Sequence, residues 1–232
     1  MCELTLLHFL GIGAQKCGTT WLFETLSAHP NICFPAGKEI HYWDRPDDRS
    51  VDWYADLFSD NKLCNGEITP AYGILPTETI NRIHSRWPNL RLIYLIRNPI
   101  DRAWSAARMA LMRAEMTHEE ASDAWFIDHF YSQGSLARGD YEACIRNWLS
   151  IYPKEQLLVL SLEMITANPV AMANRCLTHI GASPIFTSSD RENLLIKLFE
   201  GDRMPLRPSL APVLHGIYKE KNKFVSEYLN EI

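Results

Sequence analysis

The feature that most constrains this chain is a glycine-containing turn between an apolar run and a helical pattern. Residues 6–12 form an apolar run typical of a buried parallel strand, and residues 19–28 favour a helix. Between them stands Gly13-Ala14-Gln15-Lys16-Cys17-Gly18-Thr19-Thr20. Glycines let the backbone wrap around an anion, and a helix N-terminus offers unpaired N–H donors with partial positive charge. The turn therefore predicts an anion site; the alternative is a turn that only connects a strand to a helix.

Strands and helices alternate along the rest of the chain. Residues 90–96 (LRLIYLI) are the clearest buried strand, and a helix is predicted from Pro99 to Arg113. Such alternation predicts an α/β fold of three layers, α/β/α, around a parallel sheet, with residues 1–232 forming one domain. Further strands are predicted at 64–68 and 157–161, extended segments at 32–34 and 39–43, and helices at 51–58, 76–87, 118–129, 140–151, 169–180, 190–199 and the C-terminus.

Composition excludes several classes of protein. A net charge of -5 argues against a surface built to hold nucleic acid, although a local basic cleft is compatible with it. The six cysteines show no CxxC pair and no metal-ligand spacing, which favours free thiols in a reducing compartment and predicts no metal site. No apolar run approaches the roughly 20 residues of a membrane span, and the first ten residues lack a basic leader. We expect a cytoplasmic protein, unless the chain is a domain of a larger anchored one.

The turn departs from an ATP-binding Walker loop. Gly13 and Gly18 have the right spacing, but Thr19 stands where the lysine belongs and Lys16 lies inside the loop. The best candidate strand for an acidic Mg²⁺ ligand ends in Arg97. The site is therefore predicted to bind anions without a metal. An ATP-dependent small-molecule kinase and a non-catalytic nucleotide-binding module remain alternatives.

A second motif follows residues 90–96. The sequence YLIRNPIDRAWS places Arg97 at a strand end and Ser105 two turns into the next helix. An arginine fork with a hydroxyl suits a phosphate monoester. A strand-end arginine on its own is more often an ion-pair partner, and Arg102 and Arg108 are interpreted as solvated helix charges.

Together, QKCGTTWL and LIRNPIDRAWS resemble the 5′-phosphosulfate loop and the 3′-phosphate motif of the sulfotransferases that use 3′-phosphoadenosine 5′-phosphosulfate (PAPS). The closer similarity is to the heparan sulfate N- and O-sulfotransferases and their bacterial relatives, and it extends from residue 9 to about residue 165. The resemblance implies a parallel-sheet α/β fold, PAPS as co-substrate, no metal, and sulfuryl transfer to a hydroxyl or amine. The supporting stretches are KEIHYWD at 38–44, DWY at 52–54, GEITPAY at 66–72 and GDY at 139–141 leading to NWL at 147–149.

The resemblance also implies catalytic roles. The lysine matching Lys16 contacts the bridging oxygen, where negative charge grows as the phosphate leaves, and the glutamate matching Glu39 is the general base. If residues 39–43 are extended, Glu39 and His41 share a face, so His41 orients the carboxylate or acceptor, or is itself the base. Asp44 is expected to support the site.

The donor contacts implied by the resemblance span both motifs and one later segment. The segment from Gly201 to Arg207 replaces a lysine-glycine segment of the family, and Arg203 is carried over as its cation. Cys17 and Trp21 belong to the donor segment, although their side chains are expected to pack inside. Ile68 stands where the 3-O-sulfotransferases have a lysine, so the acceptor stays open among carbohydrates, lipid headgroups and small metabolites, as does the oligomeric state. The predicted donor-binding residues are Gln15, Lys16, Cys17, Gly18, Thr19, Thr20, Trp21, Arg97, Ser105 and Arg203.

Overall fold

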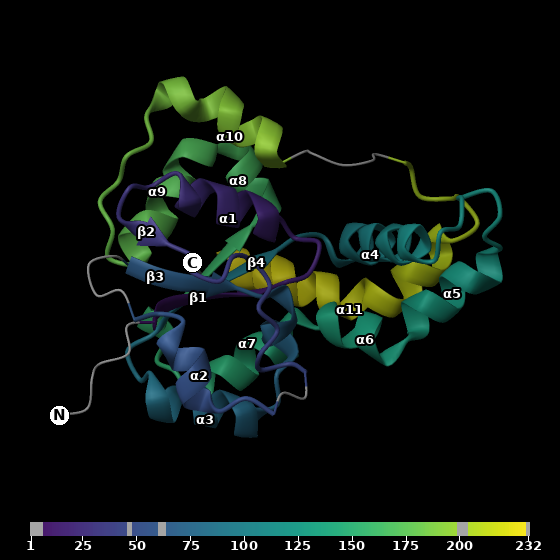
Figure 1. The fold of residues 1–232 in the computed structure, drawn as a ribbon. Helices are drawn as coiled ribbons and strands as arrows, with labels where there is room; N and C mark the ends of the chain where they lie inside the picture. The colour runs from purple at the N-terminus through teal and green to yellow at the C-terminus, as the bar shows by residue number, and fades with distance from the viewer. Residues whose placement is uncertain (1–6, 46–47, 60–63, 199–203, 231–232) are drawn as a thin grey trace.

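The computed structural model describes residues 7–45, 48–59, 64–198 and 204–230, and a five-stranded sheet lies at its centre (Figure 1). All strand pairs are parallel, in the order β2-β3-β1-β4-β5. The predicted parallel sheet is therefore confirmed. The strands are β1 (Leu7–Gly13), β2 (Ile32–Cys33), β3 (Cys64–Ile68), β4 (Arg91–Ile96) and β5 (Leu157–Ser161).

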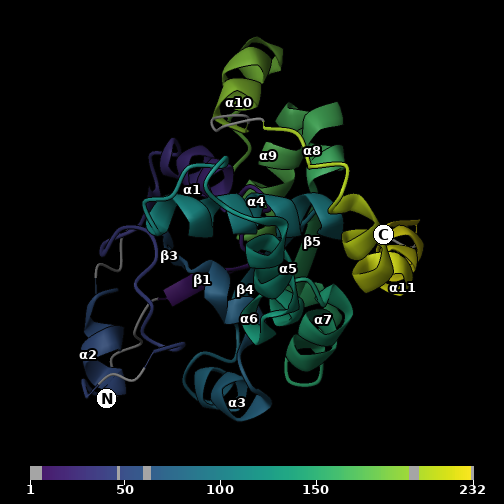
Figure 2. The same cartoon turned by 90° about the vertical axis from the view of Figure 1, so that its right-hand side faces the viewer.

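Helices cover both faces of the sheet, so the predicted three-layer α/β/α arrangement is also confirmed. One face carries α1 (Thr19–Ser27), α8 (Leu162–Ala167), α9 (Pro169–His179) and α10 (Arg191–Leu198); the other carries α2 (Val51–Asp56), α3 (Thr77–Arg86) and α7 (Tyr141–Leu149). Figure 2 shows a third group in front of the sheet, made of α4 (Pro99–Arg113), α5 (Asp123–Tyr131), α6 (Gln133–Arg138) and α11 (Ala211–Asn230). Short 3₁₀ turns occupy Pro70–Ile74, Lys154–Gln156 and Ser188–Asp190.

The main hydrophobic core includes the central strands and the helices on both faces. Five of the six residues of β4 are buried, as expected for a parallel strand covered on both faces. Phe9 and Leu10 of β1 are also fully buried. A second cluster, which includes Trp104, Phe126 and Leu214, holds α4, α5 and α11 together. This second cluster packs α4 against α5 and α11, so side chains on α4, the helix that follows β4, have fixed positions.

The prediction that residues 39–43 are extended is wrong. Glu39 and His41 have left-handed backbones, with φ of 65° and 59°, and the regular part of this segment ends with β2 at Cys33. In the turn that follows, Gly37 N donates to Phe34 O, and Glu39 N then donates to Ile68 O at the end of β3. Beyond Glu39, side-chain hydroxyl groups accept hydrogen bonds from the backbone N–H groups of His41, Tyr42 and Trp43.

The helix predicted at 118–129 begins later, at Asp123. The Ser122 side chain accepts a hydrogen bond from Trp125 N and so caps the N-terminus of α5, while Thr117 and Glu120 close a turn before it. The predicted helix at 190–199 is observed to Leu198, and Phe199 lies outside the described residues. None of the helices in the described ranges has both the length and the apolar character needed to cross a bilayer.

Candidate active site

The loop after β1 presents the N-terminus of α1. Lys16 has φ of 67° and Gly18, the N-cap residue, has φ of 94°. A left-handed φ suits glycine, and a Cβ at Gly18 would lie 3.2 Å from Leu162 Cδ1. Among the described residues no side chain caps α1. The first N–H groups of a helix have no partner within it, so this end of α1 can bind an anion.

Pairing between β1 and β4 brings the two predicted anion motifs together. Gly13 is paired with Tyr94, and Ala14 N donates to Leu95 O at 2.7 Å. Arg97, just after β4, donates from Nη1 to Lys16 O at 3.2 Å. After β1 the chain continues to β2 at one edge of the sheet, and after β4 it continues to β5 at the other edge. Ligands of α/β sheets bind at such a point, where the chain direction across the sheet reverses.

A cleft of about 950 Å³ opens at this place, and we call it the anion cleft. Its lining includes the polar residues Lys16, Arg97, Ser105 and Arg108, and Leu162 on α8 belongs to an apolar part of the wall. Asp101, Glu115, Thr117 and His118 also line the cleft, and Asp101 Oδ2 lies 3.8 Å from Arg97 Nη2. Within the described part of the chain, the buried Nε of Arg97 has no hydrogen-bond partner. An unpaired buried donor is costly, so this wall fits an anionic group such as a phosphate.

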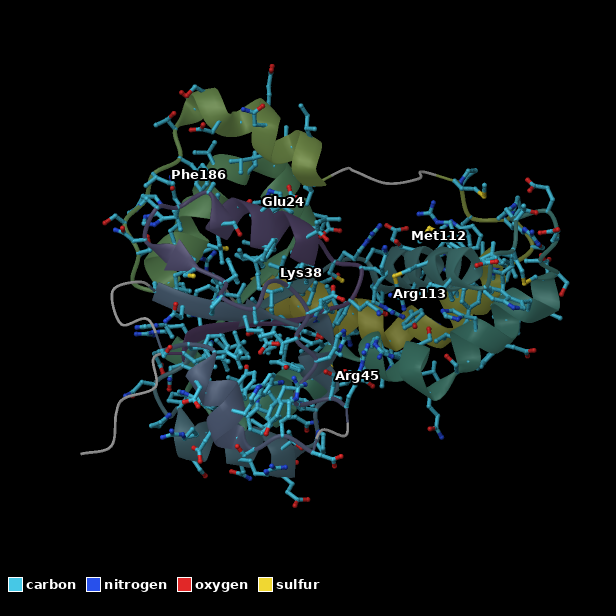
Figure 3. All side chains as sticks on the ribbon, viewed as in Figure 1. Glu24, Lys38, Arg45, Met112, Arg113 and Phe186 are labelled. Atoms are coloured by element: carbon cyan, nitrogen blue, oxygen red, sulfur yellow. The ribbon has the colours of Figure 1, made fainter. Side chains whose placement is uncertain are left out.

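Positive charge accumulates around Lys16. Burial lowers the pKa of Lys16, and the nearby guanidinium groups of Arg108, Arg97 and Arg113 lower it further, followed by the ammonium of Lys38. Figure 3 labels two outer members of this group, Lys38 and Arg113. Like charges held close together repel unless a ligand compensates them, so the cleft is prepared for a polyanion.

The loop of residues 38–44 carries the second part of the site. The Glu39 carboxylate accepts a hydrogen bond from the Lys38 ammonium, and its Oε2 lies 3.6 Å from His41 Nε2. His41 Nδ1 in turn lies 2.9 Å from Asp44 Oδ2. The predicted proximity of Glu39 and His41 is therefore observed, although it arises from left-handed residues and not from a strand.

Glu39 is poised to remain ionised. Burial alone would raise the pKa of this carboxyl, but the hydrogen bond and charge of Lys38, together with His41, outweigh it, and the net shift is downward. The side chain is 38% exposed, so an acceptor molecule can reach it. Glu39 can thus accept a proton or a hydrogen bond from a bound ligand.

The remaining predicted residues divide by burial. Ser105 lines the anion cleft, Thr19 is buried, Thr20 is exposed and Gln15 is half-buried. Arg203 lies outside the described residues.

Two side chains of the predicted donor segment lie inside the protein. Cys17 is fully buried, with its Sγ 3.4 Å from Tyr141 Oη, and burial raises the pKa of its thiol to about 11. Trp21 is 1% exposed and belongs to the main core. Any contact of these two residues with a donor therefore falls to their main chain, and their donor-binding role stays a prediction.

Sequence reasoning missed three charged residues. Arg108 lines the anion cleft and Arg102 is fully buried, where its Nη2 donates to Ser135 O and Tyr218 Oη, so neither is simply a solvated helix charge. The spacing of Ser105 and Arg108, three residues apart on one helix, could have revealed the first of these. Glu67, fully buried near the end of β3, gave no signal beyond its place in GEITPAY.

The described cysteines and acidic groups suggest no other centre. Five cysteines, all except Cys2, fall in the described ranges and are free. In the same ranges, no cluster of three or more His, Cys, Asp or Glu side chains is arranged to hold a metal ion.

A family model described as the sulfotransferase domain matches residues 7–204, and the chain belongs to this family. The chain is 30% identical over 186 residues to human heparan sulfate glucosamine 3-O-sulfotransferase 3B1, covering 76% of this chain and 46% of that protein. It is 25% identical over 299 residues to human carbohydrate sulfotransferase 15, covering 96% and 53%. The chain thus spans about half the length of these curated relatives.

Solved structures agree with this assignment. A sulfotransferase from Alicyclobacillus acidocaldarius aligns with a TM-score of 0.70 and 27% identity, over 92% of each chain. A mouse sulfotransferase complexed with PAP aligns with a TM-score of 0.62 over 99% of this chain and 92% of that one; at 13% identity this likeness concerns the fold alone. The sulfotransferase interpretation, and its relation to the heparan sulfate branch, are confirmed.

Proposed function

We propose that this chain, as a single domain, transfers a sulfuryl group from PAPS to a hydroxyl or amine of an acceptor. One observation carries the proposal: the loop that presents Glu39 lies beside the strand that leads into the anion cleft containing Lys16, Arg97 and Ser105. Glu39 N donates to Ile68 O, and Ile68 is paired with Gly11 of β1, the strand that precedes the Lys16 loop. Family membership supplies the reaction class. PAPS would provide an activated sulfuryl group on a phosphate leaving group, with a 3′-phosphate for recognition.

Different residues would bind the donor and deprotonate the acceptor. The α1 N-terminus and Lys16 would hold the 5′-phosphosulfate, and Arg97 with Ser105 would hold the 3′-phosphate. As the acceptor oxygen or nitrogen bonds to sulfur, the sulfur–oxygen bond to phosphate breaks and its electron pair stays on the phosphate. The Lys16 ammonium stabilises that charge, and Glu39 takes the acceptor proton. His41, between Glu39 and Asp44, orients the carboxylate or serves as the base in its place.

For the acceptor, we propose a carbohydrate first, because curated relatives carry heparan sulfate and carbohydrate in their names. A lipid headgroup or small metabolite is the alternative. Ile68 is fully buried, so the position where the 3-O-sulfotransferases have a lysine offers no charge to an acceptor here. A cytoplasmic location, free cysteines in a reducing compartment and the absence of a nucleic-acid partner belong to the same proposal, supported by the acidic net charge and the cysteine pattern.

The test is a calorimetric titration with PAP, the desulfated donor, in EDTA, with ATP as the comparison ligand. We expect PAP to bind and ATP not to bind, and Arg97→Ala to weaken PAP binding. Metal-dependent binding of ATP without binding of PAP would contradict the proposal and favour the kinase alternative. Binding of PAP without turnover on any carbohydrate, lipid or small hydroxyl or amine acceptor would favour the non-catalytic module.

A further inference from the structure

Glu67 is a carboxylate in an unusual place. It lies in β3, paired with Leu10 of the central strand β1, and it is fully buried. Burial of a carboxyl group is costly unless hydrogen bonds compensate for the lost water. The residue is separate from the anion cleft, so the donor contacts give no reason for its presence.

Three hydroxyl groups satisfy the Glu67 carboxylate. Oε1 accepts hydrogen bonds from Thr69 Oγ1 at 2.6 Å and from Tyr72 Oη at 2.8 Å, and Oε2 accepts one from Tyr54 Oη. Burial raises the pKa of Glu67, while these hydroxyl bonds oppose the rise. The two oxygens therefore have different partners, and those of Oε1 also accept hydrogen bonds from backbone N–H groups of the loop that carries Glu39.

The partners of Oε1 hold the backbone of the loop that carries the base. Tyr72 Oη accepts hydrogen bonds from the N–H of Tyr42 at 3.1 Å and of Trp43 at 3.4 Å, and Thr69 Oγ1 accepts a long one from His41 N at 3.5 Å. A hydroxyl has a single proton, so an oxygen that accepts from amides directs that proton to Glu67. Three successive amides of the loop are thus connected to one buried carboxylate.

The loop needs such support because its backbone is strained. Left-handed conformations at Glu39 and His41 cost about 1–3 kcal/mol each, and a hydrogen bond contributes about 1 kcal/mol. A further main-chain hydrogen bond near the base runs from Glu39 N to Ile68 O at the end of β3. Several such hydrogen bonds together contribute a free energy comparable to the strain of the two left-handed residues, so they can hold the loop in this conformation.

We infer that Glu67 is a positioning residue: through Tyr72 and Thr69 it fixes the backbone from His41 to Trp43 and so aims the Glu39–His41–Asp44 chain at the acceptor. The catalytic part of this inference rests on the proposed function. The structural part, a relay from Glu67 Oε1 to the loop amides, stands independently of it.

Two tyrosines provide a matched pair of variants. Tyr72→Phe removes the hydroxyl that links Glu67 to the loop, whereas Tyr54→Phe removes a hydroxyl that bonds the same carboxylate but contacts the loop through its ring, which stacks on Tyr42 at 4.7 Å. Both side chains are fully buried and both substitutions keep the ring. Any general loss of stability should therefore be similar in the two proteins.

The first readout is hydrogen exchange at the amides of Tyr42 and Trp43. We expect exchange to accelerate in Tyr72→Phe and in Glu67→Gln, and to stay near the wild-type rate in Tyr54→Phe. Equal acceleration in the two tyrosine variants, or none in either, would overturn the relay. This measurement needs no substrate, so it decides the relay even if the proposed function fails.

The second readout separates positioning from folding. A misplacement of reacting groups by about 1 Å costs about 100-fold in rate, so we expect kcat to fall by up to that factor in Tyr72→Phe and Glu67→Gln while PAP affinity and PAPS KM stay unchanged. The double variant should lose no more than Glu67→Gln alone. Parallel loss of PAP affinity, or full additivity of the two effects, would overturn the positioning role. Failure of the wild-type protein to bind PAP would instead refute the proposed function.

Discussion

Two loops meet at the carboxyl edge of the sheet, and they are built differently. The loop after β1 gains its shape mainly from main-chain features: glycine at position 18, pairing of β1 with β4, and the start of α1, with one side-chain hydrogen bond from Arg97 to Lys16 O. The 38–44 loop contains two left-handed non-glycine residues and depends on side chains from β3 and the turn after it. An anion can be bound by main-chain N–H groups within a short motif, whereas a base must be aimed by groups far away in the sequence.

The sharpest test of this contrast is Glu39→Gln. The amide cannot take the acceptor proton, so we expect kcat to fall about 10²- to 10⁴-fold, while PAP binding stays nearly intact because the donor contacts belong to the other loop. Turnover assays and calorimetry measure the two quantities. Glu78→Gln, an exposed carboxylate change on α3, is the control and should change neither. Comparable losses of PAP affinity in Glu39→Gln and Lys16→Ala would remove the division of roles.

Lys16→Ala should have the next largest effect, and it should affect both quantities. Loss of one fixed group that stabilises developing charge costs about 10²- to 10³-fold in kcat, and the missing cation should also weaken PAP binding. Lys154→Ala, an exposed lysine in the turn before β5, serves as the control. Unchanged turnover in Lys16→Ala would show that the anion cleft is not the reaction site.

Arg97→Lys tests whether the donor half recognises geometry as well as charge. Lysine keeps the charge but loses the planar fork, and a lost hydrogen bond to a charged group corresponds to about a 10- to 100-fold loss of PAP affinity. Binding of adenosine 5′-phosphosulfate, which has no 3′-phosphate, should change little. Equal losses for the two nucleotides in calorimetry would show that Arg97 does not contact the 3′-phosphate.

Lys38→Met should give the smallest change in kcat, and we expect that change in the pH dependence of kcat. The Lys38 ammonium holds the pKa of Glu39 below its usual range, so in the wild-type protein the base stays ionised further into acid. Removing the ammonium raises that pKa, and the acid limb of the kcat profile should move to higher pH with little change near neutrality. An acid limb that stays in place would contradict the assignment of Glu39 as the general base.

The sequence was sufficient for the parts of this protein that depend on local pattern. Buried strands such as Arg91–Ile96, the helix that begins at Pro99, and the two anion motifs are contiguous, and parallel strands bring successive strand ends to one edge. The first strand, predicted at residues 6–12, is observed as Leu7–Gly13, with Leu6 outside the described residues, and it needed only periodicity and glycine positions. That Lys16 lies in an anion-binding loop stays a prediction, based on glycine positions and family resemblance. For the same reason, the sulfotransferase class could be inferred before any coordinates.

Only the tertiary structure decided how the base is presented. Alternation of side chains suggested an extended segment at 39–43, but the hydroxyl groups of Tyr72 and Thr69 hold that backbone and left-handed residues bring Glu39 to His41. Likewise Arg102, placed on the surface by sequence reasoning, is enclosed by α6 and α11. In each case the deciding partners are distant in sequence. Periodicity reports only which face of an element is apolar, whereas the aim of a polar group depends on hydrogen bonds that form when the chain is folded.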